Sequence, residues 1–535
     1  MLSIQQRLLI LLMITLALGG CAPKHLQPTQ EQKSVIKEKE ASDSLYYLAK
    51  DDVSSHYPKT GFYSLSNNLD AFIARVALIE NAKKSLDLQY FIFAGDETAY
   101  AIIQLLIEAA DRGVKVRVLV DDLLEGDSDE EIATLAQHPN IDIKLFNPTS
   151  ARKMLGWIQL AFNVNTLGRR MHNKLLVADN SAAVLGGRNI ENIYFAADRD
   201  DIFIDNDILA IGPLASKATY EFETYWNSPI SKDIIKIADK AKSSSYEAFR
   251  KELFKSVNTL RQNAYISEAY QRAFAQSLLK DEVPLIYGDA QLYYDKPTKI
   301  ITSEDDSSTH LSEHLKPIVM AAKKSLKIIN PYFIPNEGMM KNIRILRTRG
   351  VEISVLTNSL ATNDGIPVYS AYSRYQKELV TLGVHLYELN PHSFSYIYKN
   401  QKYRKGSIPR SSLHAKSMLI DDEIFIIGSA NLDPRSIKLN TEVVAVIHSA
   451  KLAEVESEVL RHATEAKNVF KIEVEAVPDD EQTCSVTEVP QAKSRVVWVA
   501  EENGKVVKYY NEGDAGFWRV LGSNLSAYIP MDKYL

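Results

Sequence analysis

Two stretches of the chain carry the same set of chemically active side chains at the same spacing. Both follow the pattern H-x-K-x4-D-x6-G-[GS]-x-N. The first copy contains His172, Lys174, Asp179, Gly186, Gly187 and Asn189, and the second contains His414, Lys416, Asp421, Gly428, Ser429 and Asn431. An imidazole can attack phosphorus or transfer a proton, and an ammonium group can hold a phosphate oxygen. Two matching copies therefore predict a site that acts on a phosphate ester.

The spacing within each copy predicts how these side chains are presented. His172 and Lys174 are two residues apart, so on a strand they point to the same face. A turn at Asp179 and a second apolar strand then bring Asn189 back beside them. Two such hairpins related by a pseudo-twofold axis would face each other across a cleft. The residues expected to bind phosphate are Lys174, Asn189, Lys416, Ser429 and Asn431.

Each imidazole also needs an acceptor that fixes its orientation. Glu442 is the candidate acceptor for His414. The repeat places Asp205 opposite Asn440 and Asp207 opposite Glu442, so one of the two aspartates is expected to hold His172. The sequence does not separate these two aspartates.

No metal ion or other cofactor is expected at this site. Zinc would need Cys, His or carboxylate ligands at ligand spacing around the motif histidines. The chain has no H-E-x-x-H sequence and only two cysteines, Cys21 and Cys484. A lysine beside each histidine would also repel a cation. The motif aspartates, Asp179 and Asp421, lie at turns and are expected to brace the site rather than to transfer protons.

The two motifs belong to a longer duplication. Residues 81–91 (NAKKSLDLQYF) match residues 321–333 (AAKKSLKIINPYF), and residues 112–119 match residues 349–356, each pair about 240 positions apart. In each half a helical pattern stops at a glycine and is followed by strand alternation. The sequence therefore predicts an α/β fold of two repeats. Each repeat is expected to be a central sheet flanked by helices, and the two pack about a pseudo-twofold axis with the active site at their interface.

The pattern changes on either side of these repeats and between them. Residues 229–285 show helical spacing, which favours an insert packed on the first half, with a lid or membrane-docking role as the alternative. Asn503-Gly504 between apolar runs predicts a hairpin. The predicted parts are a signal peptide (1–20), an anchor and polar tether (21–57), the first repeat (58–228), the insert (229–285), the second repeat (286–470) and a linker with a C-terminal hairpin (471–535).

The amino terminus predicts export and anchoring. Its apolar run, which ends near Leu18, is shorter than the ~20 residues that span a bilayer and has the size of a signal-peptide core. The residues Leu18-Gly19-Gly20-Cys21 resemble a bacterial lipobox, in which the cysteine is lipidated. This resemblance implies a periplasm-facing protein of the cell envelope. Ala22, in place of aspartate, favours the outer membrane over the inner one.

The net charge of the chain and the basic stretches before the motifs indicate which class of substrate the protein binds. The whole chain of 535 residues has a net charge of −6, which argues against general binding to nucleic acid. Residues 149–178 and 391–420, which lead into the two motifs, contain no Asp or Glu but several Arg and Lys, together with apolar and aromatic residues. Basic and apolar groups beside a phosphate site favour a phospholipid at an interface. A nuclease is the alternative, because it would use basic and aromatic residues too.

The paired motifs resemble the signature of the phospholipase D superfamily, H-x-K-x4-D, over about residues 60–470. The order of segments, the lipobox-like start and the tail with Trp498 and Trp518 are most similar to bacterial cardiolipin synthases of the C type. The resemblance implies a metal-free reaction through a phosphatidyl-histidine. It also implies transfer of a phosphatidyl group between phospholipids, such as phosphatidylglycerol and phosphatidylethanolamine, at a membrane surface.

The same resemblance implies roles for the two histidines. The first histidine of such pairs is usually the nucleophile, which implies that His172 attacks and His414 is the general acid. Gly187 departs from the second copy, which has Ser429, so a hydroxyl contact to phosphate is expected on one side alone. Three functions stay open: a phosphatidyltransferase that makes cardiolipin, a hydrolase acting on phospholipid or nucleic acid, and a non-catalytic envelope binding protein.

Overall fold

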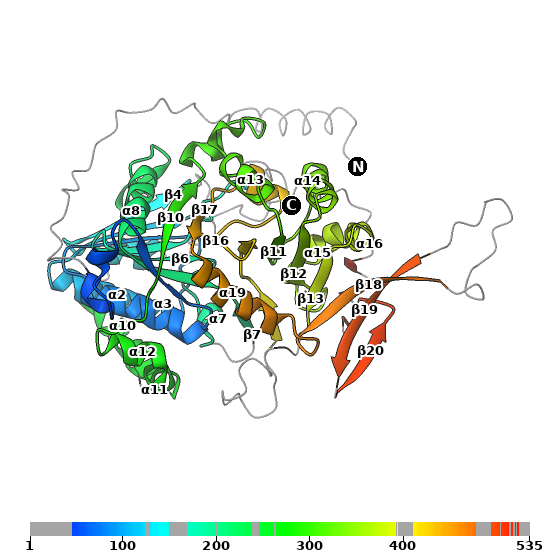
Figure 1. The fold of residues 1–535 in the computed structure, drawn as a ribbon. Coiled ribbons are helices and arrows are strands. Elements are labelled where there is room, and N and C mark those ends of the chain that lie inside the picture. Colours follow the sequence, from blue (N-terminus) through cyan, green and yellow to red (C-terminus); the bar gives the residue numbers. More distant parts are fainter. Residues whose placement is uncertain are drawn as a thin grey trace, which may run out of the picture.

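The duplication in the sequence corresponds to two sheets with the same strand order. The computed structural model describes residues 45–122, 129–148, 168–197, 201–237, 246–261, 264–391, 393, 410–477, 494–502, 504–512, 515–516, 519–520 and 522–523. The first sheet runs β9-β4-β3-β2-β5-β6-β8-β1 and the second runs β18-β13-β12-β11-β15-β16-β17-β10. The expected fold of two sheet-and-helix repeats is therefore confirmed (Figure 1).

The first half contributes strands β1 (Thr60–Ser64), β2 (Ser85–Tyr90), β3 (Lys115–Asp121), β4 (Ile141–Phe146), β5 (Leu175–Ala178), β6 (Ala182–Gly186), β7 (Asp201–Ile204), β8 (Asp207–Ile211) and β9 (Ser231–Asp233). Its helices are α2 (Asn68–Asn81), α3 (Glu97–Asp111), α4 (Asp129–Leu135), α7 (Asn192–Phe195), α8 (Pro213–Trp226) and α9 (Ile234–Ile237). Three further helices follow, α10 (Tyr246–Arg261), α11 (Ala264–Gln271) and α12 (Ala273–Leu278).

The second half contributes strands β10 (Ile286–Tyr294), β11 (Ser325–Ile329), β12 (Glu352–Asn358), β13 (His385–Leu389), β14 (Arg410–Leu413), β15 (Ser417–Ile420), β16 (Ile424–Gly428), β17 (Val443–His448), β18 (Val469–Ala476), β19 (Ser494–Glu502) and β20 (Lys505–Tyr509). Its helices are α13 (Ser312–Met320), α14 (Glu337–Thr348), α15 (Ile366–Ser373), α16 (Gln376–Thr381), α18 (Pro434–Lys438) and α19 (Ala450–Ala463).

Glycine ends the corresponding helix in each half. α3 is followed by Gly113 with φ +92°, and α14 is followed by Gly350 with φ +82°. This left-handed conformation carries little steric cost for glycine and ends a helix, so the chain turns directly into β3 or β12. In both halves the next strand is buried and pairs in parallel with its neighbours.

Strand β10 and a shared core join the two halves. β10 pairs with β1 through Ile286–Gly288 and with β17 through Asp289–Tyr294, so one strand belongs to both sheets. Between the sheets, apolar side chains from β5, β6 and β8 pack with those from β15, β16 and β17. Phe62, Leu185, Phe425 and Ile447 are among these side chains, and all are buried. The motif histidines and lysines come directly before two of these strands, β5 and β15.

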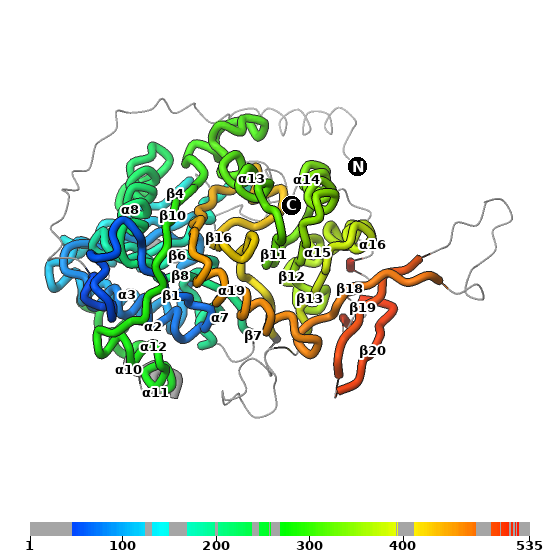
Figure 2. Tube along the Cα trace, viewed as in Figure 1, coloured from blue at the N-terminus to red at the C-terminus, as the bar shows by residue number. Residues whose placement is uncertain are grey.

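The insert and the C-terminal strands extend the halves at opposite ends, as Figure 2 shows. Leu253 of α10 is buried in the core of the first half. Strands β19 and β20 form the hairpin that the sequence predicts, and β19 continues the second sheet beyond β18. Trp498 anchors this extension, because its Nε1 donates to the buried carboxylate of Glu388 at 2.9 Å. Among the described residues, no helix has both the length and the apolar character to span a membrane.

Candidate active site

The two motif hairpins form as the sequence predicts. β5 pairs with β6 and β15 pairs with β16, and Asp179 and Asp421 begin their turns with φ +54° and +56°. The Asp179 carboxylate accepts hydrogen bonds from the backbone N–H groups of Lys83, Lys84 and Ser85 at 2.7–2.9 Å.

Asp421 repeats this arrangement with the backbone N–H groups of Lys323, Lys324 and Ser325 at 2.7–3.1 Å. Each carboxylate ties its hairpin to the start of the neighbouring strand, β2 or β11. In this geometry both aspartates brace the hairpins.

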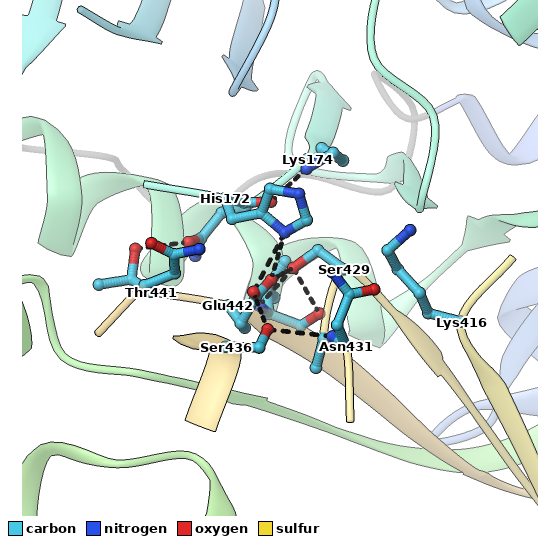
Figure 3. Close-up of polar contacts among 12 residues, drawn as sticks. His172, Lys174, Lys416, Ser429, Asn431, Ser436, Thr441 and Glu442 are labelled. Carbon is cyan, nitrogen blue, oxygen red and sulfur yellow. Dashed lines mark hydrogen bonds and ion pairs between the residues drawn. The ribbon is translucent and has the colours of Figure 1, made fainter. Parts of the chain in front are cut away.

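The partners of the two histidines differ from the expected ones. Nδ1 of His172 lies 2.9 Å from Glu442 Oε2, and Nδ1 of His414 lies 2.7 Å from Asp205 Oδ2. The sequence interpretation, which paired Glu442 with His414 and an aspartate with His172, was therefore wrong. Each half supplies the carboxylate for the histidine of the other half, and Figure 3 shows the contact of His172 with Glu442.

Backbone pairing between the halves causes this exchange. The N–H of His172 donates to the carbonyl of Thr441, the residue before Glu442, at 2.9 Å. The N–H of His414 donates to the carbonyl of Ile204, the residue before Asp205, at 2.7 Å. The strand before His414, β14, also pairs in parallel with β7, the strand before Asp205. These backbone contacts place each carboxylate beside the imidazole of the opposite half.

The strand register decides between Asp205 and Asp207. Gly186 pairs with Asp207, whereas the equivalent Gly428 pairs with Val444. The counterpart of Glu442, two residues before Val444, is therefore Asp205. The sequence match that set Asp207 opposite Glu442 was shifted by two residues.

Asp207 has a different part in the structure. Its carboxylate lies 2.9 Å from the guanidinium of Arg75 and 3.3 Å from that of Arg188, and all three side chains are buried. The expectation that Asp207 could orient a histidine was wrong, because its carboxylate forms ion pairs with two arginines.

The motifs differ at one position, which is Gly187 in the first copy and Ser429 in the second. The difference follows from the carboxylate that lies next to each residue. A Cβ at Gly187 would overlap the carboxylate of Asp205. At Ser429 the longer Glu442 leaves room, and the hydroxyl donates to Oε2 of Glu442 at 2.5 Å while it accepts from the N–H of Val443. Ser429 was expected to contact phosphate. Its hydroxyl is instead committed to Glu442.

Further positioning residues were missed by the sequence analysis. Asp121 at the end of β3 accepts from the N–H of Met171 at 2.8 Å, and Asn358 at the end of β12 accepts from the N–H of Leu413 at 2.8 Å. Each holds the backbone just before a motif histidine. A polar residue at the carboxyl end of an apolar parallel strand was the available signal. Ser436 was missed too; its hydroxyl donates to Oε1 of Glu442.

Aromatic rings enclose both imidazoles. Phe91 meets His172 edge to face with ring centroids 5.1 Å apart. Phe203 stacks on His414 at 5.0 Å, and Tyr194 meets the same imidazole edge to face. These rings keep the two imidazoles nearly buried, with 8% and 7% exposure for His172 and His414.

The lysines sit beside the histidines, as the spacing predicts. Nζ of Lys174 donates to the carbonyl of His172 at 2.6 Å. Nζ of Lys416 lies 3.0 and 3.2 Å from the two ring nitrogens of His414. Both ammonium groups are buried.

The two asparagines are used differently. Asn189 has protein partners for its amide, since it accepts from the N–H of Ile92 and donates to the Tyr194 hydroxyl at 2.9 Å. The buried Oδ1 of Asn431 has no hydrogen-bond partner among the described residues. Asn431 lies between Glu442 and Lys416 in Figure 3, so its amide oxygen is placed to accept a hydrogen bond from a ligand.

Burial and the lysines keep both imidazoles neutral. Burial lowers the pKa of His172 to about 4, with Lys174 acting in the same direction and Glu442 opposing it. Burial and Lys416 lower the pKa of His414 to about 4 against the effect of Asp205. A neutral imidazole whose Nδ1–H is held by a carboxylate exposes the lone pair of Nε2.

The remaining charges complete an anion site. Burial would raise the pKa of Glu442 and of Asp205, but the facing histidines and lysines lower both, that of Asp205 to about 2. Burial lowers the pKa of Lys416 to about 8 and that of Lys174 well below its ordinary value. A bound phosphodiester would stabilise the protonated lysines and histidines, since an opposite charge favours the charged form.

Several predicted features lie outside the described residues. Cys21, Cys484 and Trp518 are among them, as are residues 149–167 and 394–409 of the basic stretches. From the first stretch, Arg169 is described, and its guanidinium contacts Glu304 at 3.2 Å and the carbonyl of Thr302 at 2.6 Å. Over the described part of the chain, no cluster of three or more His, Cys, Asp or Glu side chains is placed to hold a metal ion.

A model of the family described as cardiolipin synthase, PLD-like domain, matches the chain twice, over residues 76–226 and 315–463. The chain belongs to this family. These two matches contain the two motif hairpins. As a member of this family, the protein is an enzyme of the phosphatidyltransferase class.

Named relatives are similar over most of the chain. Cardiolipin synthase C of Escherichia coli is 32% identical over 90% of this chain and 98% of its own length. Cardiolipin synthase 1 of Bacillus cereus is 25% identical over 75% of this chain and 67% of its own length. The crystal structure of phosphatidylserine synthase from Haemophilus influenzae has a TM-score of 0.53 at 16% identity, covering 78% of this chain and 90% of that one, which shows the shared fold.

Proposed function

We propose that this protein makes cardiolipin by transferring a phosphatidyl group from one phospholipid to another through a covalent phosphatidyl-histidine. One observation carries the proposal. Two buried neutral imidazoles, each fixed at Nδ1 by a carboxylate of the opposite half, are flanked by two lysines. That arrangement supplies a nucleophile, an acid–base and an anion site, which are the parts that two successive displacements at phosphorus need.

In the first step His172 is the nucleophile. Its Nε2 forms a bond to phosphorus of phosphatidylglycerol, and the bond from phosphorus to the headgroup oxygen breaks. His414, protonated once the anionic phosphate is bound, donates its Nε2 proton to that oxygen, and glycerol leaves. Glu442 accepts a hydrogen bond from the Nδ1–H of His172, so this proton stays on the ring. The carboxylate also stabilises the positive charge that forms on the imidazole.

The second step reverses these roles. His414, now neutral, takes the proton from a headgroup hydroxyl of a second phospholipid. The oxygen attacks phosphorus, the bond from phosphorus to His172 breaks, and cardiolipin is released. The ammonium groups of Lys174 and Lys416 hold the non-bridging oxygens in both steps. The second lipid is phosphatidylglycerol, whose headgroup carries the attacking hydroxyl. Phosphatidylethanolamine, which has an amine in its headgroup, could serve only as the donor, with ethanolamine as the leaving group.

We place this reaction in the bacterial cell envelope. The lipobox-like residues Leu18-Gly19-Gly20-Cys21 support lipidation at Cys21 and a periplasm-facing protein, and Ala22 favours the outer membrane. Mass spectrometry of the mature N-terminus tests this placement: a diacylated cysteine is expected, and an unmodified Cys21 in the mature protein would contradict it.

Product analysis tests the reaction. The protein is incubated with vesicles of radiolabelled phosphatidylglycerol, with or without phosphatidylethanolamine, and the lipids are separated by chromatography. Labelled cardiolipin is expected. Phosphatidic acid as the sole product would instead identify a hydrolase, and cleavage of DNA with unaltered lipid would identify a nuclease.

A further inference from the structure

A cavity of about 360 Å³ lies inside the second half, next to the active site. It is enclosed by α13, α14 and the inner strands of the second sheet, and its volume is within the range of small-ligand sites, ~300–1,000 Å³. Most of its wall is apolar, with Val319, Ile343 and Met418 as examples. At one end, however, the wall is made by Lys416, Asn431 and Glu442.

In the first half, side chains fill the space that corresponds to this cavity. There a buried group of large and charged side chains packs between α2, α7 and the sheet, with Arg75 bonded to Asp207 and to Tyr90. The members of this group are Arg75, Tyr90, Arg188, Phe195 and Asp207.

The second half has smaller and uncharged residues at every one of these positions. The matching KKS sequences at residues 83–85 and 323–325, the motif spacing and the strand register fix the correspondence. The counterparts, in the same order, are Leu315, Asn330, Ala430, Ile437 and Val444, and all five line the cavity. The two halves therefore share a strand order, but this space is filled in the first half and forms a cavity in the second.

Helix α13 covers this cavity without being buried. Its counterpart in the first half, α2, buries every residue from Asn68 to Ile79. None of the nine residues of α13 is buried, although Leu315, Ile318 and Val319 are half-buried against the apolar core. An amphipathic helix over an empty apolar space indicates that a bound ligand contacts the apolar face of the helix.

We propose that this cavity binds one fatty-acyl chain of the phospholipid whose phosphate is held by the active site. The inference rests on the proposed function and names the part of the lipid that the second half recognises. A flexible hydrocarbon chain fits an apolar chamber with a polar opening, because the chain leaves water while the ester and phosphate stay at Lys416 and Asn431.

The polar end of the cavity adjoins the site that holds the phosphatidyl group. Glu442, which holds His172, lines the cavity together with Lys416, which lies 3.0 Å from Nδ1 of His414. The phosphatidyl group attached to His172 in the intermediate can therefore keep its acyl chain in the cavity. Glycerol can leave and the second lipid can enter without disturbing it.

Binding of a dansyl-labelled fatty acid tests the cavity without any reaction. In the full-length wild-type protein we expect the fluorescence of this probe to shift to the blue and to be reversed by long-chain phosphatidylglycerol. Val319→Trp, which fills the chamber, should abolish the shift. Ile318→Trp is the matched control, because Ile318 is half-buried on the same helix but does not line the cavity.

Kinetics with donors of different acyl length test the link to catalysis. For the wild type, kcat/KM should rise by about fourfold per added methylene until the cavity is filled. Val319→Trp should lose this dependence and retain less than about one tenth of the wild-type kcat/KM on long-chain donors. The melting temperature of both variants checks that they fold.

Equal probe binding by Val319→Trp and wild type, or an unchanged chain-length dependence in Val319→Trp, would overturn the acyl-chain site while leaving the proposed transferase intact. Conversely, a wild-type protein that turns over no phospholipid of any length would overturn the proposed function, and probe binding would then decide the cavity by itself.

Discussion

Nδ1 of His172 lies 2.9 Å from Glu442 Oε2, although the two residues are 270 positions apart and belong to different halves of the duplication. The reciprocal contact joins His414 to Asp205 at 2.7 Å. Because each half completes the other's imidazole, neither repeat contains a working site by itself. The exchange also lets the function of each histidine be tested through a residue of the opposite half.

Glu442→Gln should therefore impair the nucleophile and not the acid–base. The amide cannot hold the Nδ1–H tautomer as an anion does, so we expect kcat to fall by about 10³–10⁴-fold, with no phosphatidyl adduct. Asp205→Asn should show a similar fall in kcat on phosphatidylglycerol. With labelled phosphatidyl-p-nitrophenol, whose leaving group needs no proton from His414, Asp205→Asn should accumulate adduct, as His414→Ala should, and denaturing gels measure that adduct. Adduct in Glu442→Gln but none in Asp205→Asn would reverse the two histidine roles.

Asp207→Asn should act on stability. It leaves Arg75 and Arg188 buried beside a neutral amide, and removal of one partner of a buried ion pair costs about 3–5 kcal/mol. Thermal or urea unfolding measures the loss. If Asp207→Asn instead left stability intact and blocked turnover as Asp205→Asn does, our separation of the two aspartates would be wrong.

The shape of the site at Gly187 and Ser429 predicts unequal effects of exchange. Gly187→Ser should abolish turnover, because the added side chain would displace the Asp205 carboxylate. Ser429→Gly removes one hydrogen bond to a buried carboxylate, about 1.5–3 kcal/mol, so a 10- to 150-fold fall in kcat is expected. Steady-state rates on phosphatidylglycerol compare the two. A fully active Gly187→Ser variant would refute this account.

The pH dependence of kcat/KM follows from the charges of the free enzyme. Both imidazoles have a pKa of about 4, so activity should be lost as pH falls through about 4 and His172 gains a proton on Nε2. Lys416 has a pKa of about 8, so activity should also be lost as pH rises through about 8 and its ammonium group becomes neutral. The two limbs belong to coupled groups and report apparent values. An acidic limb near 6.5, the ordinary value for histidine, would contradict the buried neutral state.

Removal of metal ions should not change the rate. The two lysines beside the imidazoles disfavour a bound cation, and the nucleophile needs no metal-activated water. Activity after dialysis against a chelator should equal that of the untreated protein within about twofold. A loss that zinc or calcium restores would show that a metal takes part.

The duplicated pattern allowed the fold and the motif residues to be predicted closely. Helix stops at Gly113 and Gly350, hairpins at Asp179 and Asp421, and the pairing of lysine with histidine are all local features, set by residues near one another in the chain. Such features depend on backbone preference and strand periodicity, which a sequence displays directly.

The histidine partners were predicted less well, and the reason is physical. A sequence comparison aligns residues but does not count strand register, so Asp207 was set opposite Glu442 when Asp205 is the true counterpart. It also gives no sign that β7 and β14 pair across the halves. Ser429 looked like a phosphate ligand for the same reason, since its hydroxyl bond to Glu442 exists only in the folded chain.

The sequence by itself determined that the protein has two equivalent imidazole–ammonium pairs on two equivalent hairpins, because repeated spacing on a strand fixes which side chains share a face. Only the tertiary structure decided which carboxylate holds which imidazole, and that the space beside Arg75 is filled in the first half whereas its equivalent in the second half is a cavity. Both outcomes depend on contacts between residues far apart in the chain, between the halves for the carboxylates and within the second half for the cavity, and local backbone preference does not set these contacts.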